Sequence, residues 1–279
     1  MDLHDFDDVA QNYDLYLSEM YKEKDMYDGF KDFYLELAKE YGKYGVIDVA
    51  CGTGAVLLEL AQNGIDIEGC DLSDAMVKVC AEKVSSSRLK AKVFSGNMTN
   101  FKSGRKYSLA IIARSGFMHL LSGEDQRKTL LNIREHLTDG GILTLNTFQP
   151  FPMIQSAQMQ STENDYRFRL EYTNKEGFKE KIYCAETYDY ITQIMSGNWK
   201  FETYDNNGNI ISERIRPLKM RQTYISELTY LAELCGFKVA ARYGDYYKST
   251  EETGRYVWIF KKIELGKNQN MQTKETDKN

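Results

Sequence analysis

The sequence is poor in the residues that build disulfide frameworks, metal centres and rigid turns. Among 279 residues there are three His, three Pro and two Trp, and the five Cys are odd in number and contain no Cys-x-x-Cys pair. Neither a disulfide framework nor a His/Cys zinc site fits this inventory. We therefore expect no bound metal.

Long apolar runs and an excess of either charge are also missing. No segment approaches the ~18 apolar residues that a membrane span needs, and residues 1–8 are acidic where a secretory signal would be basic and then apolar. Lys and Arg number 36 against 41 Asp and Glu, and a formal net charge of −5 does not attract a phosphate backbone. We expect a cytoplasmic protein with neither a membrane nor a nucleic-acid partner.

From residue 46 onward, the sequence alternates between short apolar runs and amphipathic stretches with apolar residues at helical spacing. Strands that alternate with helices predict an α/β fold in which helices cover both faces of a parallel sheet. The predicted strands are residues 46–51, 65–70, 92–95, 107–114, 142–147, 237–243 and 255–262. The predicted helices are residues 27–44, 55–61, 73–84, 122–137 and 228–235.

Helical spacing disappears between residues 166 and 217. Strand-like runs are separated there by turn signals at residues 174–177 and 205–209, which predicts an inserted antiparallel sheet. Tyrosine, which occurs 20 times, is almost absent from residues 46–150, where only Tyr107 occurs. Its concentration before this core and within the insertion indicates that some tyrosines line a pocket for a polar small molecule.

The turn after the first predicted strand carries the first ligand signal. Ligands of open parallel sheets bind at the carboxyl ends of the strands. Here Gly52 and Gly54 allow the backbone to approach a ligand closely, and the preceding Asp48 suits a cationic group rather than a pyrophosphate. A dinucleotide fold would have a third glycine where Leu57 stands, and a phosphate-binding loop would have Lys-Ser/Thr after Gly54. Both phosphate-binding patterns are missing.

Two further signals follow the next two strands. Asp71 ends the second strand, and an acid at that place accepts hydrogen bonds from both hydroxyls of a ribose. Asn97 follows the third strand and can pair with the edge of an adenine, while Leu72 and Met98 offer apolar faces to its ring. Together with Asp48, these residues predict a ligand that contains adenosine and a positive group but no phosphate.

The motifs resemble those of class I S-adenosylmethionine-dependent methyltransferases. The residues that carry the resemblance are 46–54 (VIDVACGTG), 71–76 (DLSDAM), 96–98 (GNM) and 137–141 (LTDGG), and residues 6–14 resemble the family's N-terminal lid. The resemblance extends over about residues 6–262. It implies a Rossmann-like, seven-stranded and mostly parallel sheet, S-adenosyl-L-methionine as cofactor and S-adenosyl-L-homocysteine as product.

The place of the insertion is similar to that in small-molecule N-methyltransferases acting on amino sugars and glycine-type amines. The implied reaction is in-line methyl transfer to a small-molecule acceptor, at nitrogen rather than oxygen, by a monomer or homodimer. An NAD(P)-dependent oxidoreductase and a non-catalytic cofactor-binding module remain as alternatives. The implied organisation is a helical lid (1–45), a cofactor-binding core (46–150), an antiparallel roof over the acceptor pocket (151–222), completion of the core (223–263) and a disordered tail (264–279).

The resemblance also implies a set of site residues. His119, the one histidine in a strand-end loop, is the candidate catalytic residue, as a base or as a group that orients the acceptor; His4 and His136 are expected at the surface. Many relatives carry Asp where this chain has Asn97. The predicted cofactor-binding residues are Tyr13, Asp48, Ala50, Cys51, Gly52, Gly54, Asp71, Leu72, Met76, Asn97, Met98 and Arg114. The predicted substrate-binding residues are Tyr21, Phe117, Arg216 and Arg221.

Overall fold

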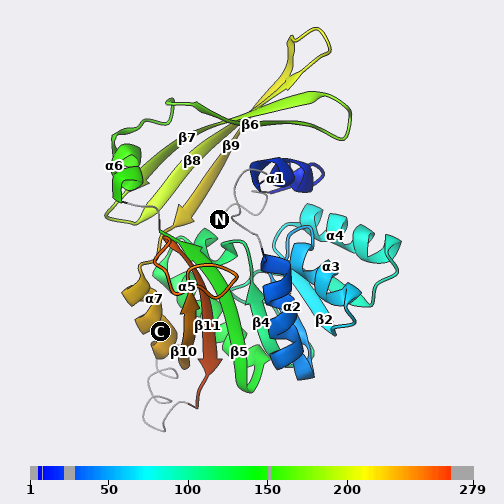
Figure 1. Ribbon diagram of the computed structural model, residues 1–279, viewed down its shortest axis with the longest axis vertical. Coiled ribbons are helices and arrows are strands. Elements are labelled where there is room, and N and C mark those ends of the chain that lie inside the picture. Colours follow the sequence, from blue (N-terminus) through cyan, green and yellow to red (C-terminus); the bar gives the residue numbers. More distant parts are fainter. Residues whose placement is uncertain (1–5, 8, 22–28, 150–151, 265–279) are drawn as a thin grey trace.

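The computed structural model describes residues 6–7, 9–21, 29–149 and 152–264. Its main element is a seven-stranded sheet with the strand order β10-β11-β5-β4-β1-β2-β3 (Figure 1). The strands from β5 to β3 are parallel, whereas β11 and β10 are antiparallel to their neighbours. This confirms the mostly parallel sheet expected from the sequence. The strands are β1 (Val46–Val49), β2 (Ile67–Asp71), β3 (Ala91–Ser95), β4 (Tyr107–Ile112), β5 (Leu137–Phe148), β10 (Phe237–Tyr243) and β11 (Arg255–Lys262).

Helices cover both faces of this sheet. On one face, α2 (Phe30–Tyr41), α3 (Ala55–Gln62) and α4 (Asp74–Ser86) contribute to one hydrophobic cluster with the strands. On the other, α5 (Gly123–His136) and α7 (Ile225–Leu234) contribute to a second cluster. The central strands β1 and β4 are consequently buried along their whole length and contain near-continuous apolar residues.

A second sheet of four antiparallel strands, in the order β6-β7-β8-β9, lies above the first in Figure 1. Its strands are β6 (Arg167–Thr173), β7 (Lys179–Asp189), β8 (Ile194–Tyr204) and β9 (Ile210–Arg221), which confirms the antiparallel insertion. The helix α6 (Pro152–Gln160), which precedes these strands, was not predicted from the sequence. This helix contacts the inserted sheet through Gln158, whose Nε2 donates a hydrogen bond to Glu186 of β7 at 3.1 Å.

The helix α1 (Tyr13–Tyr21) connects the inserted sheet to the main one (Figure 1). Tyr16 and Leu17 pack in one cluster with Phe201 of β8 and with Met76 and Val79 of α4. The apolar burial holds the N-terminal segment between the two sheets. It also places Phe6 and Tyr13 near the carboxyl ends of the parallel strands, where both line the same cavity as residues from those strand ends.

Two local expectations need correction. His136 is 8% exposed rather than at the surface, because its Nε2 accepts a hydrogen bond from the Ser103 N–H at 3.2 Å and its Nδ1 lies 2.8 Å from the Asn132 carbonyl. Residues 138–141, which separate the predicted helix 122–137 from the predicted strand 142–147, lie inside β5. The buried residues of α2, which falls within residues 1–45, pack into the main core, and the predicted lid stays a prediction. Residues 22–28 of that lid and 265–279 of the predicted tail lie outside the described residues.

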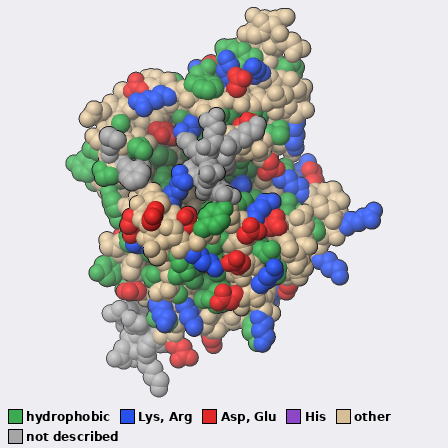
Figure 2. All heavy atoms as spheres, in the orientation of Figure 1, with side chains coloured by type: hydrophobic (Ala, Val, Ile, Leu, Met, Phe, Trp, Pro, Cys, Tyr) green, Lys and Arg blue, Asp and Glu red, His purple; other side chains and the backbone are tan. Residues whose placement is uncertain are grey.

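Acidic and basic side chains are interspersed over the face shown in Figure 2. Within the described part of the chain, no helix combines the length and apolarity that crossing a membrane requires. The same residues contain no group of three or more His, Cys, Asp or Glu side chains arranged to hold a metal ion.

Candidate functional site

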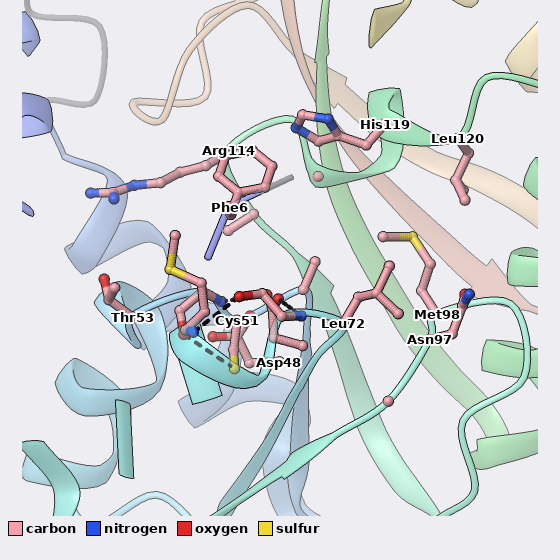
Figure 3. A pocket seen from close by; sticks show the side chains of 18 of the residues that line it. Phe6, Asp48, Cys51, Thr53, Leu72, Asn97, Met98, Arg114, His119 and Leu120 are labelled. Atoms are coloured by element: carbon pink, nitrogen blue, oxygen red, sulfur yellow. Dashed lines mark hydrogen bonds between the residues drawn. The ribbon is translucent and has the colours of Figure 1, made fainter. Parts of the chain in front are cut away.

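A cavity of about 280 Å³ lies where the carboxyl ends of the parallel strands meet the N-terminal segment. In Figure 3, Asp48 and Cys51 lie on one side of it and Phe6 and His119 on the other. Most of the residues predicted from the sequence line this cavity, although they come from separate strand ends. They are Tyr13, Asp48, Ala50, Cys51, Gly52, Asp71, Leu72, Met76, Asn97, Met98, Arg114 and His119.

The two glycines of the turn after β1, Gly52 and Gly54, have different roles. Gly52 has a φ of 55° and faces open space, since no atom lies within 4 Å of where its Cβ would be. Gly54 has a φ of 92°, and a Cβ there would stand 2.5 Å from the Sγ of Cys80 in α4. Gly54 does not line the cavity. Packing requires glycine at this position, because only glycine lets α3 start this close to α4, and the predicted cofactor contact of Gly54 stays a prediction.

Asp48 provides a buried negative group at the end of β1. It is 1% exposed, and its Oδ1 has no hydrogen-bond partner among the described residues. Burial and the neighbouring charge of Asp71 raise its pKa to about 7, against the opposing effects of a backbone hydrogen bond from Leu57 and the charge of Arg114. A buried acceptor without a donor fits a cationic, hydrogen-bonding group such as an ammonium.

Asp71 is held rigidly at the end of β2. Its Oδ2 accepts a hydrogen bond from the Gly52 N–H at 2.8 Å, and its Oδ1 accepts one from the Ser73 N–H at 2.9 Å. Burial raises its pKa, and the backbone hydrogen bonds from Ser73 and Gly52 oppose that rise. Each carboxylate oxygen has a further lone pair, so the pre-positioned group can accept hydrogen bonds from a vicinal diol.

Asn97 and Met98 form the wall near the end of β3. The Oδ1 of Asn97 accepts hydrogen bonds from both the N–H and the hydroxyl of Thr99, each at 2.9 Å. The Met98 carbonyl accepts a hydrogen bond from Asn132 of α5 at 3.2 Å. Together with Leu72, the Met98 side chain gives this part of the cavity apolar surfaces of the kind that fit a flat ring.

His119 ends η3 (Gly116–His119), the short 3₁₀ helix after β4. Its ring makes an edge contact with Phe6, with centroids 5.3 Å apart, and a backbone hydrogen bond with Lys219 of β9. Burial and the charge of Arg216 lower its pKa to about 4. The imidazole is consequently neutral at pH 7.

The backbone between β4 and η3 is strained beside the cavity. Arg114 and Ser115 have φ values of 49° and 61°, which non-glycine residues rarely adopt. Asn146 of β5 stabilises this conformation, because its Oδ1 accepts from the Ser115 N–H and its Nδ2 donates to the Ser115 hydroxyl, both at 3.1 Å. Such strain is often retained at functional sites, and here it places Arg114 on the cavity wall.

Three of the four predicted substrate-binding residues, Phe117, Arg216 and Arg221, do not line the cavity. Phe117 is fully buried in the main core, because η3 turns its ring inward. Arg221 is held away from the cavity by hydrogen bonds to Gln126 at 3.0 Å and to Glu227 at 2.5 Å. The guanidinium of Arg216 is buried and lies 4.0 Å from the centroid of Phe6, which does line the cavity. The side chain of Tyr21 lies outside the described residues.

Several residues that line the cavity were not predicted from the sequence. Thr53 lines the cavity, and its hydroxyl donates to Asp14 of α1 at 2.6 Å. The hydroxyl of Ser73 likewise hydrogen-bonds Asp7. Asp7 and Asp14 of the N-terminal motif could have indicated these contacts. Their partners, Ser73 and Thr53, lie in the two turns that form the cavity floor. The remaining cavity residues that were not identified include Phe6, Thr99, Leu120, Leu121 and Asp125.

The sequence is similar to those of known methyltransferases. Residues 46–141 match the protein family described as Methyltransferase domain. A protein of Geobacillus sp. (strain WCH70) that is named as a methyltransferase is 28% identical over 130 residues, which cover 46% of this chain and about half, 53%, of that protein. The glycine/sarcosine N-methyltransferase of Parasynechococcus marenigrum (strain WH8102) is 25% identical over 239 residues, covering 83% of this chain and 76% of the relative.

Solved structures share the fold. The CcbJ methyltransferase from Streptomyces caelestis has a TM-score of 0.70 at 22% identity, covering 85% of this chain and 90% of that one. The sugar N-methyltransferase KedS8 from Streptoalloteichus sp. has a TM-score of 0.67 at 16% identity, covering 90% of this chain and 93% of that one. Residues 46–141 are thus similar to a methyltransferase domain, and the fold of the chain is that of solved methyltransferases.

Proposed function

We propose that this protein transfers a methyl group from S-adenosylmethionine to a nitrogen atom of a small-molecule acceptor. The observation that carries the proposal is the buried Oδ1 of Asp48, which lacks a hydrogen-bond donor and faces a cavity built at the strand ends. S-adenosylmethionine supplies an activated methyl group together with an ammonium that fits this acceptor. The relatives named above, which methylate glycine, sarcosine and sugars at nitrogen, support the same reaction class.

Different residues of the cavity bind different parts of S-adenosylmethionine. In this proposal Asp48 receives the ammonium of the methionine part, while Gly52 lets the backbone approach it. Asp71 accepts the ribose hydroxyls, since both of its oxygens are already oriented by backbone N–H groups. Leu72 and Met98 enclose the adenine ring.

His119 orients the acceptor rather than removing its proton. A pKa of about 4 makes the imidazole a weak base, so it does not compete for the proton of an alkylammonium ion. The backbone bond to Lys219 raises the pKa, as donation by one ring nitrogen to a carbonyl would, and leaves the other nitrogen as a hydrogen-bond acceptor. That nitrogen can accept from the N–H of a neutral amine and direct its lone pair.

The low basicity of His119 also favours a nitrogen atom over an oxygen atom as the methyl acceptor. A neutral amine is already a nucleophile, whereas an alcohol is nearly as weak an acid as water and needs a strong base to become one. Among the residues that line the cavity in the described part of the chain, His119 is the only histidine, and no lysine is present.

The two alternatives fit the site less well. The position where a dinucleotide fold would have its third glycine is occupied by Leu57, which is fully buried in the packing of α3. A carboxylate at Asp48 would also repel a pyrophosphate. A non-catalytic binding module would not require a neutral imidazole beside Phe6 and the ligand cavity.

Two measurements test the proposal. Calorimetry should show binding of S-adenosylhomocysteine to the wild-type protein, and an Asp71→Ala variant that remains folded by circular dichroism should lose it. A panel of glycine, sarcosine and amino sugars should then be screened with S-adenosylmethionine, with methylated products identified by mass spectrometry. Absence of binding by the folded wild-type protein, or methylation exclusively at oxygen, would contradict the proposal.

A further inference from the structure

We infer that Asp125 accepts a hydrogen bond from the 6-amino group of adenine and thereby selects adenine over other bases. The inference rests on the proposed placement of the ligand and adds a specificity-determining residue to it. Asp125 belongs to the first turn of α5 and lines the same cavity as Asn97 and Met98.

The hydrogen bonds of Asn97 show that another residue must accept the hydrogen bond from the 6-amino group of adenine. Its amide oxygen is the atom that accepts from the Thr99 N–H, and this orientation is fixed because a backbone N–H can only donate. The Thr99 hydroxyl bonds to the same oxygen. The amide group left for a ligand is therefore the NH₂, which can donate to a ring nitrogen of adenine but cannot accept from an amino group.

The cavity contains one carboxylate that is not otherwise assigned. Of the acids that line it in the described part of the chain, Asp48 lies near the end of β1 and Asp71 ends β2, next to the glycine turn. Asp125 comes from the other face of the main sheet, on α5. A carboxylate at the edge of the ring offers the acceptor that a 6-amino group requires.

The helix α5 is fixed against the adenine wall. Asn132, about two helical turns beyond Asp125 and on the same helix face, donates to the Met98 carbonyl at 3.2 Å. This bond aligns the Asp125 face of α5 with the loop that holds Asn97 and Met98. The start of the helix therefore points toward the same end of the cavity.

Asp125 also has a structural role that the experiment must separate. Its N–H donates to the Ser122 hydroxyl at 3.0 Å, and that hydroxyl donates to its Oδ2 at 2.8 Å, as in a helix cap. The cap uses one carboxylate oxygen and leaves the other for a ligand. Thr99, whose hydroxyl oxygen can also accept, is the competing residue for the 6-amino group.

Calorimetry with two probes tests the inference. The probes are S-adenosylhomocysteine and its analogue with hydrogen in place of the 6-amino group. The wild-type protein should bind the natural ligand at least about tenfold more tightly, because a hydrogen bond to a charged group contributes ~1.5–3 kcal/mol. Asp125→Ala should weaken S-adenosylhomocysteine by about tenfold and change the analogue less than about twofold.

Two further variants complete the design. Glu124→Ala removes the neighbouring exposed acid of the same helix turn, which pairs with Lys128, and should leave both affinities unchanged. In the Asp125→Ala background, Asn97→Asp should restore the preference for the 6-amino ligand, because a carboxylate at 97 can serve Thr99 with one oxygen and adenine with the other.

The outcomes separate this inference from the proposed function. If Asp125→Ala keeps the wild-type preference, or weakens both probes equally, the 6-amino acceptor lies elsewhere and the inference is overturned while the ligand site stands. If the preference disappears only in Thr99→Val, Thr99 is the acceptor and the inference is again overturned. If the folded wild-type protein binds neither probe, both the inference and the proposed function fail.

Discussion

Asp48 and Asp71 lie at the ends of neighbouring parallel strands and face one cavity, where the charge of Asp71 contributes to raising the pKa of Asp48 to about 7. Two carboxylates in such an arrangement make the empty site electrostatically unfavourable. A bound cation relieves that cost. Part of the binding energy of the ligand therefore comes from strain that the folded protein already contains.

Asp48→Asn should stabilise the ligand-free protein at alkaline pH. Between its unfolded pKa of about 3.8 and its folded value of about 7, the folded state binds more protons, so stability falls as pH rises through this window. The cost is fully present above pH 7 and amounts to at most about 4 kcal/mol. Urea unfolding at pH 8 should show a gain of about 1–4 kcal/mol in the free energy of unfolding.

The same variant provides its own control. At pH 5 the gain should be less than half of that at pH 8, because folded wild-type Asp48 is already protonated there. Binding of S-adenosylhomocysteine should be strongly weakened at pH 8. An equal gain at both pH values would show that the effect is not electrostatic.

The affinity for S-adenosylhomocysteine should decrease at acid pH. Below about 7 the carboxyl of Asp48 is protonated in the empty cavity, whereas an ammonium ligand keeps it ionised, so binding must release a proton. For a pKa of about 7, affinity should fall about tenfold between pH 8 and pH 6. Calorimetry in buffers of different ionisation enthalpy should detect the proton, and Asp48→Asn should show neither effect. A pH-independent wild-type affinity would contradict this assignment.

At saturating S-adenosylmethionine, where the titration of Asp48 does not limit cofactor binding, the pH profile of methyl transfer should not show a step near 6.5. Burial and Arg216 lower the pKa of His119 to about 4, so His119 stays neutral through the neutral range. The acid limb of kcat/KM should instead follow the pKa of the acceptor amine and move when an acceptor of different pKa is used.

Two variants of His119 distinguish orientation from proton removal. His119→Gln keeps a hydrogen-bond acceptor and should retain more turnover than His119→Ala, while both should bind S-adenosylhomocysteine as the wild type does. His119→Ala should lower kcat by about tenfold or more, because orientation at the reacting atom is lost. A limb near 6.5 that disappears in both variants would instead establish a base role.

Residues whose place depends on local chain direction were predictable, and those whose place depends on packing were not. Asp48, Asp71 and Asn97 follow strands, so the carboxyl edge of a parallel sheet brings them together whatever the rest of the chain does. Phe117 directly follows the same kind of loop, but the turn of η3 sends its ring into the core. Asp125 was not predicted from the sequence, because it reaches the cavity only when α5 docks against the sheet.

The close approach of Gly54 to Cys80 should appear as energetic coupling between the two positions. Gly54→Ala places a Cβ 2.5 Å from the Cys80 Sγ and also imposes a φ of 92°, so it should destabilise the protein by about 2 kcal/mol or more. Cys80→Ala removes the sulfur and should recover the steric part, about 1 kcal/mol, while the φ cost remains. Gly52→Ala, with φ of 55° but open space around it, should be additive with Cys80→Ala in urea unfolding. If Gly54→Ala were also additive with Cys80→Ala, the contact between the glycine turn and α4 would not be the constraint that selects glycine at this position.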